Sequence, residues 1–224
     1  MKPTNRIQMA WPKISTPKRQ SFAACLLPGL GVCVGLSGCF GFLKPSPSIA
    51  RYFVLTPVPA ADAPANAPGT IAIGIGQVRL PSYLFNSSLA VRRGSNEIDY
   101  SQSALWAERL DSGVQRVLAA NLATLLRTQH VHLSSWRSED VSAEVYVVIE
   151  QFDVDAGGEG VLVAGWRILA AGGEKLLRSG ESRSKRKGPE PDKDPSGAVA
   201  TLSELLGDLG RQLAQALSEA TPKQ

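Results

Sequence analysis

The feature that most limits the fold is an uncharged run from Ser21 to Leu43, which separates a basic N-terminal segment from the rest of the chain. The first 38 residues hold five of the 24 basic residues and none of the 20 acidic ones, so the remainder carries 19 basic against 20 acidic residues. All three cysteines (Cys25, Cys33 and Cys39) also lie within the first 39 residues. The folded body is therefore nearly neutral and free of cysteine, which excludes a disulfide framework and a cysteine-ligated zinc site there.

The N-terminal segment has the layout of a bacterial export signal, in which basic residues precede an apolar stretch. This stretch ends in Leu36-Ser37-Gly38-Cys39, which resembles the lipobox of bacterial lipoproteins: a long apolar residue, two small residues and then the cysteine. The resemblance implies a lipoprotein signal peptide over 1–38, lipid attachment at Cys39 and a lipidated tether over 39–50.

The residue after the cysteine bears on the destination of the protein. Phe40 stands there instead of an aspartate, and by resemblance to enterobacterial sorting rules this predicts an outer-membrane anchor with the protein on the periplasmic face. Three acyl chains on Cys39 would exceed the two signals that stable attachment requires. A permanent transmembrane helix is the alternative, because 23 uncharged residues can span a bilayer, although Pro28 and five glycines in the run disfavour it.

Patterning beyond the tether predicts strands and two helices. Apolar residues at three- and four-residue spacing predict one helix from Ser103, as its N-cap, to about residue 126, with Trp106 in its first turn, and a second helix over 198–220. A Lys-Arg-Lys run followed by three prolines predicts a charged loop over 185–197. Alternating or β-branched runs between Gly and Pro predict strands at 51–55, 70–78, 89–93, 97–101, 131–134, 143–154, 161–168 and 175–184.

The fold class follows from this order of elements. Each predicted helix has a single apolar stripe, so we expect both helices to pack against a sheet. We therefore predict an α/β fold in which a single domain over 51–220 packs two long amphipathic helices on a mixed β-sheet, an α/β sandwich. A body of this length can bury a sizeable core.

We find no catalytic constellation in the body and expect neither an enzyme nor a cofactor. Gly74-Ile75-Gly76 begins like a dinucleotide-binding motif, but Arg79 stands at its third glycine position and Pro81 follows where a helix should begin. We interpret the two glycines as small residues on a strand that another element approaches closely.

Other candidate ligands have simpler explanations. His130 and His132 stand two apart, and Asp153, Asp155 and Glu159 gather near a predicted hairpin. Surface exposure and turn chemistry account for them, so we expect no metal site. An excess of basic residues would indicate a nucleic-acid partner, but the body is nearly neutral, so we expect no such partner. The Lys-Arg-Lys run could touch lipid headgroups, but acids follow it, and a solvated loop is the simpler interpretation.

Five blocks stand in order along the chain, within a similarity over residues 39–218: 51–55, 75–84, 104–110, 148–153 and 162–166. These blocks resemble the ABC-type transport auxiliary lipoproteins, the PqiC-like family. The resemblance implies an outer-membrane lipoprotein with a periplasmic α/β sandwich. It also implies partners: an MCE-domain protein that bridges the envelope, and ABC transporter or permease components that move phospholipid between membranes. The long 185–197 loop departs from the family pattern.

On this resemblance the chain is an accessory lipoprotein that acts by binding its partners. The alternative is a periplasmic lipid-binding carrier, which would need a deep apolar pocket, whereas an envelope hydrolase would need a nucleophile–base pair that we do not find. We expect the partner-binding surface to include Tyr83, in the Pro81–Leu84 turn, and Trp106, because such aromatic residues near element ends make good interface anchors. The opposing interpretation places both in the core. Homo-oligomerisation stays open.

Overall fold

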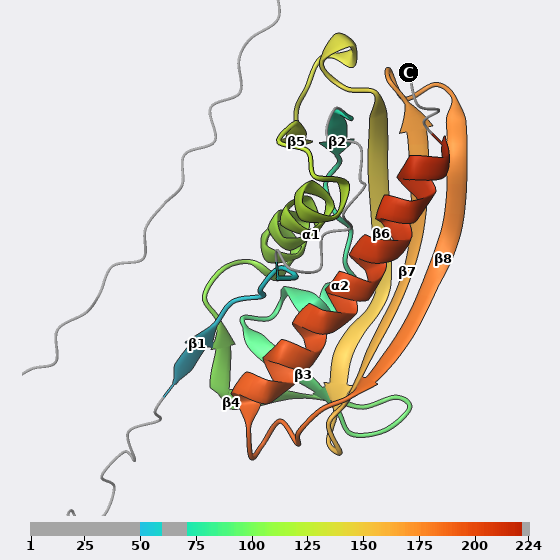
Figure 1. Cartoon of the computed structure of the whole chain (residues 1–224). Helices are drawn as coiled ribbons and strands as arrows, with labels where there is room; N and C mark the ends of the chain where they lie inside the picture. The colour runs from blue at the N-terminus through green and yellow to red at the C-terminus, as the bar shows by residue number, and fades with distance from the viewer. Residues whose placement is uncertain (1–49, 60–70, 221–224) are drawn as a thin grey trace, which may run out of the picture. The chain divides into compact units, whose positions relative to one another are not determined.

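The computed structural model describes residues 50–59 and 71–220, which lie within one compact unit. These residues form an eight-stranded mixed sheet and two long helices, so the predicted single α/β domain is confirmed (Figure 1). In chain order the elements are β1 (Arg51–Phe53), β2 (Ile73–Ile75), the 3-10 helix η2 (Ser82–Phe85), β3 (Ser88–Arg92), β4 (Ile98–Trp106), α1 (Leu110–Leu126), β5 (Val131–Leu133), the 3-10 helix η3 (Ser138–Asp140), β6 (Ala143–Asp155), β7 (Glu159–Ala170), β8 (Leu176–Lys187) and α2 (Pro195–Ala220).

Strand β6 is central because it pairs along both of its edges. On one edge it pairs antiparallel with β7, which pairs antiparallel with β8, so the predicted three-strand meander is confirmed. On the other edge, β2 pairs in parallel with the start of β6 and β3 pairs in parallel with its end. This side of the sheet follows the order β1-β4-β3-β6-β2-β5.

The two long helices contact each other and cover one face of the sheet (Figure 1). Helix α2 lies across β6, β7 and β8, and α1 lies beside β5. The apolar stripe predicted for the second helix is confirmed, and burial of each leucine in it contributes about 2 kcal/mol. The buried members of this stripe are Val199, Leu202, Leu205, Leu206, Leu209, Leu213 and Leu217.

The first helix begins later than its sequence periodicity predicts. Ser103 is not an N-cap and Trp106 is not in a helical turn, since both belong to β4, and α1 starts at Leu110. The cause is tertiary, because β4 pairs with β1 on one side and β3 on the other, which satisfies its backbone groups. Its side chains alternate accordingly: Ala104 and Trp106 are buried and Leu105 between them is half-buried.

Two further boundaries differ from the prediction. The charged loop is shorter than 185–197, because 185–187 continue β8 opposite β7 and α2 already begins at Pro195. The strand predicted at 70–78 is reduced to β2, after which the chain follows the edge of β6 through a bridge between Arg79 and Val148. Tertiary pairing, which local patterns do not encode, fixes the ends of β2 and β8. The start of α2 has a local cause, because Pro195 takes the first helical position and Oδ1 of Asp194 accepts a hydrogen bond from the N–H of Gly197 at 3.0 Å.

The close approach predicted at the two glycines is confirmed. A Cβ atom on Gly74 would overlap the ring of Trp136, and one on Gly76 would lie 2.6 Å from the ring of Tyr146. The glycines therefore let two aromatic side chains pack directly onto the backbone. The motif serves packing at the edge of β6.

Candidate functional site

A groove of about 610 Å³ opens between the end of η2 and the connection from β4 to α1. The Phe85 side chain is 58% exposed. The guanidinium carbon of Arg109 lies 6.0 Å from the centre of the Phe85 ring, within cation–π distance. Arg109 is itself held by Asp111, with 2.6 Å between Nη2 and Oδ2. The lining of this Phe85 groove consists of Phe85, Asn86, Ser87, Trp106, Ala107, Glu108, Arg109 and Leu110.

The local sequence turns Phe85 outward. The backbone N–H of Leu84 donates to the carbonyl oxygen of Pro81 at 3.0 Å, which closes the turn. The Leu84 side chain is 3% exposed and anchors η2 in the core. The Asn86 side chain then accepts a hydrogen bond from the N–H of Ser88 at 2.9 Å and ends the turn. With Leu84 buried, its neighbour Phe85 points to solvent.

Trp106 forms the buried floor of the Phe85 groove. Its side chain is 8% exposed, and it belongs to the main hydrophobic core. Its backbone N–H donates to the carbonyl oxygen of Ser87 at 2.7 Å, and the N–H of Ala107 donates to that of Phe53 at 2.9 Å. These bonds hold the groove floor between β1 and β3. The residue is a core side chain that lines the groove.

Tyr83 lies in an internal polar cluster instead of the Phe85 groove. Its hydroxyl donates to Oδ2 of Asp153 at 2.7 Å, and Nη2 of Arg92 lies 2.6 Å from the same oxygen. Burial, and then the hydrogen bond to Asp153, raise the pKa of the Tyr83 hydroxyl well above its usual value. This hydroxyl therefore stays protonated and works as a structural donor that holds η2 against β6.

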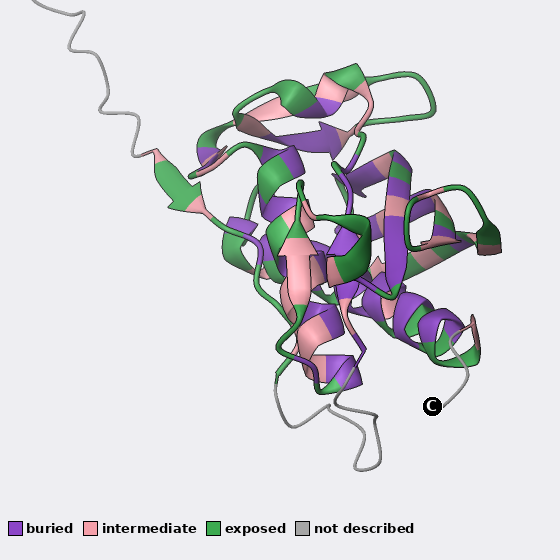
Figure 2. Ribbon diagram, turned by 90° about the horizontal axis from the view of Figure 1, so that it is seen from above, coloured by how far each residue is buried: buried purple, intermediate pink, exposed green. Residues whose placement is uncertain are grey.

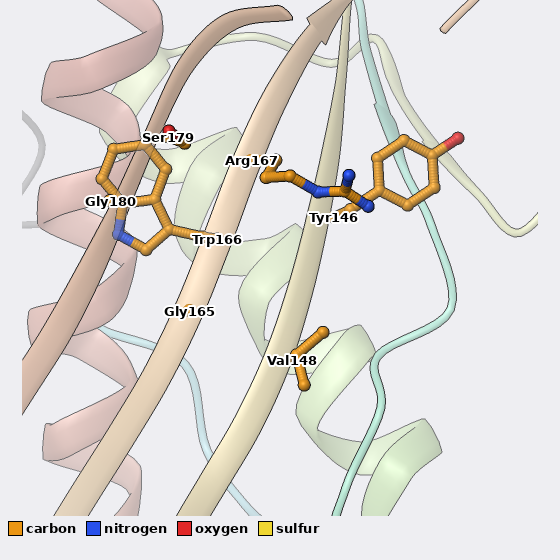
Figure 3. Close-up of a pocket in the computed structure, with 7 residues that line it drawn as sticks. All are labelled: Tyr146, Val148, Gly165, Trp166, Arg167, Ser179 and Gly180. Atoms are coloured by element: carbon orange, nitrogen blue, oxygen red, sulfur yellow. The ribbon is translucent and has the colours of Figure 1, made fainter.

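A second hollow of about 390 Å³ lies on the face of β6–β8 that the helices leave uncovered (Figure 3). Gly165 stands opposite Val148, and a Cβ atom at this glycine would meet nothing within 4 Å. Val148 is 46% exposed. Figure 3 shows Arg167 and Tyr146 reaching to one side and the Trp166 ring to the other. The lining residues are Tyr146, Val148, Gly165, Trp166, Arg167, Ser179 and Gly180.

The acidic residues near the predicted hairpin have structural partners. Oδ1 of Asp155 accepts a hydrogen bond from the N–H of Glu159 at 2.7 Å and closes the β6–β7 turn. The Glu159 carboxylate pairs with Lys185 at 2.8 Å. Within the described ranges, no group of three or more His, Cys, Asp or Glu residues could hold a metal ion. Turn chemistry thus accounts for Asp155 and an ion pair for Glu159. For Asp153 the expectation of surface exposure and turn chemistry is wrong, because this residue is 1% exposed and accepts hydrogen bonds from Tyr83 and Arg92.

The basic run at 185–187 is part of β8 and does not form the predicted solvated loop. Besides the Lys185 pair with Glu159, Nη2 of Arg186 lies 2.9 Å from Oδ2 of Asp208 on α2. The carboxylates of Glu159 and Asp208 therefore compete with lipid phosphate for the positively charged side chains of the run. Lys185 therefore pairs within the meander, and Arg186 joins the meander to α2.

Cys39, the signal peptide over 1–38 and residues 39–49 of the predicted 39–50 tether lie outside the described residues. In the part of the chain that the structure describes, neither helix combines the length and the apolarity that crossing a bilayer requires. Lipid attachment at Cys39 stays a prediction from the sequence.

Phe85 and Arg109 are residues of the groove that the sequence pattern did not single out. Twenty-four positions separate them, and they meet because β3 and β4 pair and bring η2 beside the start of α1. A local signal exists for Phe85, since it is an aromatic residue just before the turn-forming Asn86-Ser87. No comparable local signal marks Arg109.

Comparison with solved structures shows the fold. A Xanthomonas campestris protein assigned to DUF330 superposes with a TM-score of 0.64 at 11% identity, covering 76% of this chain and 96% of that one. An uncharacterized protein superposes with a TM-score of 0.59 at 18% identity, covering 75% and 99%. No curated protein matches the sequence. A family model does match, over residues 53–214, and the chain therefore belongs to the family of the ABC-type transport auxiliary lipoprotein component.

Proposed function

We propose that this chain is an outer-membrane-anchored periplasmic accessory lipoprotein of an MCE/ABC-type intermembrane lipid transport system. The family match over residues 53–214 is the observation that carries this proposal. The lipobox at Leu36–Cys39 and the following Phe40 support an anchor in the outer membrane. The chain acts by binding an MCE-domain protein and its transporter or permease partners, without catalysis of its own.

The Phe85 groove is the surface that we assign to partner binding. Exposed aromatic side chains over well-packed pockets are typical anchors of protein interfaces. Phe85 supplies such a side chain, Trp106 a rigid apolar floor, and Glu108 and Arg109 a charged rim. Tyr83 contributes indirectly, because its bond to Asp153 fixes the turn that presents Phe85. Of the two residues expected to bind partners, Trp106 thus lines the groove and Tyr83 positions it.

The carrier alternative requires an enclosed apolar cavity large enough for acyl chains. The space between the helices and the sheet is instead filled by side chains under 2% exposed, among them Leu118, Phe152 and Leu205. The hollows of about 390, 610 and 450 Å³ all include polar or charged lining residues. We therefore favour a docking role. A tightly bound phospholipid in native mass spectra, beyond the acyl chains on Cys39, would favour the carrier instead.

Phe85→Ser tests the docking role, because the exposed ring can be removed without opening the core. The lipidated protein is isolated from membranes with its partners, which are identified and quantified by mass spectrometry. Loss of a binding anchor worth about 2 kcal/mol should reduce capture of the MCE-domain protein about thirtyfold. Trp106 is a poorer test position, since its substitution would also destabilise the fold.

Leu176→Ser is the matched control for Phe85→Ser. Leu176 is 53% exposed at the start of β8, so the change removes a similar apolar side chain from another surface. Its capture of partners should equal that of the unmodified protein, and both variants should keep the same melting temperature. Equal capture by both variants would remove the Phe85 groove from the proposal, and absence of any MCE-domain protein would overturn the proposed function.

A further inference from the structure

Strand β1 leaves apolar side chains in solvent beside the predicted tether. It pairs in parallel with β4, with Tyr52 opposite Leu105. Tyr52 is 67% exposed and Val54 is 47% exposed, whereas Leu55 is 2% exposed. Because side chains alternate along an extended chain, Tyr52 and Val54 lie on the same side, away from the core. We name Tyr52, Val54 and the half-buried Leu105 the β1 outer face.

Most of the β1 ribbon is exposed in Figure 2, where this strand follows directly from the N-terminal trace. Other exposed large apolar side chains of the described part lie singly on separate elements. Phe85, Leu133, Val148 and Leu176 are of this kind. Tyr52 and Val54, by contrast, stand two residues apart and continue onto Leu105 of the neighbouring strand. Contiguous apolar surface of this kind marks a site of contact.

The length and composition of the preceding chain indicate what covers this face. Arg51 follows Cys39 by 12 residues, which span at most about 40 Å when fully extended. No acidic residue occurs before Asp62, while Lys44 and Arg51 are basic and aromatic residues flank them. Basic and aromatic side chains together favour the headgroup region of an anionic membrane.

We propose that the β1 outer face rests in the headgroup region of the membrane that holds Cys39. This inference relies on the acyl anchor of the proposed function. The short tether keeps β1 at a high effective concentration near the bilayer, so even a weak interfacial contact is populated. The Tyr52 ring takes the interfacial position that tyrosine favours. Arg51 lies on the other side of the strand, where its guanidinium carbon is 5.2 Å from the centre of the Phe53 ring. The contact sets one orientation of the domain on its membrane.

The experiment uses a label at position 52 of the full, lipidated protein. After signal-peptide removal, the mature chain keeps Cys39 alone, with its thiol blocked by lipid, so Tyr52→Cys provides a unique thiol. An environment-sensitive fluorophore is attached, and the protein is placed in vesicles of phosphatidylethanolamine and phosphatidylglycerol with brominated acyl chains. Leu176→Cys, on β8, is the matched control. We expect blue-shifted emission and several-fold stronger bromine quenching at position 52 than at position 176.

A second label, at Val54→Cys, guards against disturbance caused by the dye, and each variant must keep the melting temperature of the parent. Equal, weak quenching at positions 52, 54 and 176 would overturn the inference. So would burial of the β1 labels only after a partner protein is added, which would make this face a protein interface. The mass of the acylated chain and its capture of partners are recorded on the same samples, so a failure of the anchor or of the proposed function is recognised separately.

Discussion

At the residue scale, the buried carboxylate of Asp153 controls the position of η2. It is 1% exposed and accepts hydrogen bonds from Tyr83, Arg92 and the side-chain amide of Gln151. The pKa of Arg92 lies above its usual value, mainly because its guanidinium donates a hydrogen bond to Asp153. A buried carboxylate with three donors has its hydrogen-bonding capacity well satisfied. Removing it costs stability because the donors around it lose their acceptor.

Asp153→Ala should therefore destabilise the fold by about 3 kcal/mol, because Arg92 and Tyr83 are left without their acceptor. Tyr83→Phe removes a single hydroxyl and should cost about 1 kcal/mol. Chemical denaturation monitored by circular dichroism measures both. Asp99→Ala is the control, since Asp99 pairs with Arg93 in solvent and its loss should leave stability nearly unchanged. Equal losses for Asp153→Ala and Asp99→Ala would contradict this role.

At the element scale, α2 is tied to the edge of the meander by charge as well as by its apolar stripe. Asp208 accepts from Arg186 of β8 at 2.9 Å and from Arg211 of its own helix at 2.8 Å. Burial alone raises the pKa of Asp208, but the hydrogen bonds from Arg211 and Arg186 outweigh it and hold this pKa below its usual value. In the folded protein Asp208 thus stays ionised at a pH low enough to protonate the same residue in the unfolded chain.

The sign of the pH effect follows from this lowered pKa. The stability that Asp208 contributes is present above its ordinary pKa of about 4 and is lost as the pH falls through the lower folded value. Asp208→Asn should cost about 1 kcal/mol at neutral pH, because the site is partly solvated. The gap in unfolding free energy between the parent and this variant should shrink below about pH 4. Urea titrations at several pH values measure the gap, and a gap that is constant down to pH 2 would argue against the ionised pair.

The elements that the sequence predicts well are those with strong local signals. The leucine stripe of α2 and the glycine-separated strands of the meander carry their own periodicity. The end of β4 does not, since Leu105 and Leu110 mimic part of a helical stripe and only pairing with β1 and β3 makes Trp106 a strand residue. Trp106 could be selected as a site residue because it is an aromatic residue near the end of an element, which the sequence alone shows. The approach of Arg109 to Phe85 depends on the pairing of β3 with β4, so it could not be predicted from local sequence.

At the scale of the whole molecule, the sequence predicts a lipid anchor and the structure describes the folded body that follows it. The body is nearly neutral, has a filled core, and carries the Phe85 groove that we propose as the docking surface. Attachment therefore depends on the N-terminal cysteine in this proposal. Because a single acyl chain binds only marginally, the proposed three-chain anchor determines where the body is held.

Cys39→Ala should abolish this anchor without altering the body. The lipobox cysteine supplies the thiol for the thioether, so the variant should retain residues 1–38, carry no acyl mass and be lost from the outer-membrane fraction. Intact mass measurement and membrane fractionation give the two readouts. Cys33→Ala is a matched control, because it removes a thiol from the same uncharged run but leaves Leu36-Ser37-Gly38-Cys39 intact, and it should be processed normally. If Cys39→Ala kept the acyl mass, or if Cys33→Ala lost it, the attachment site would have to be moved away from Cys39.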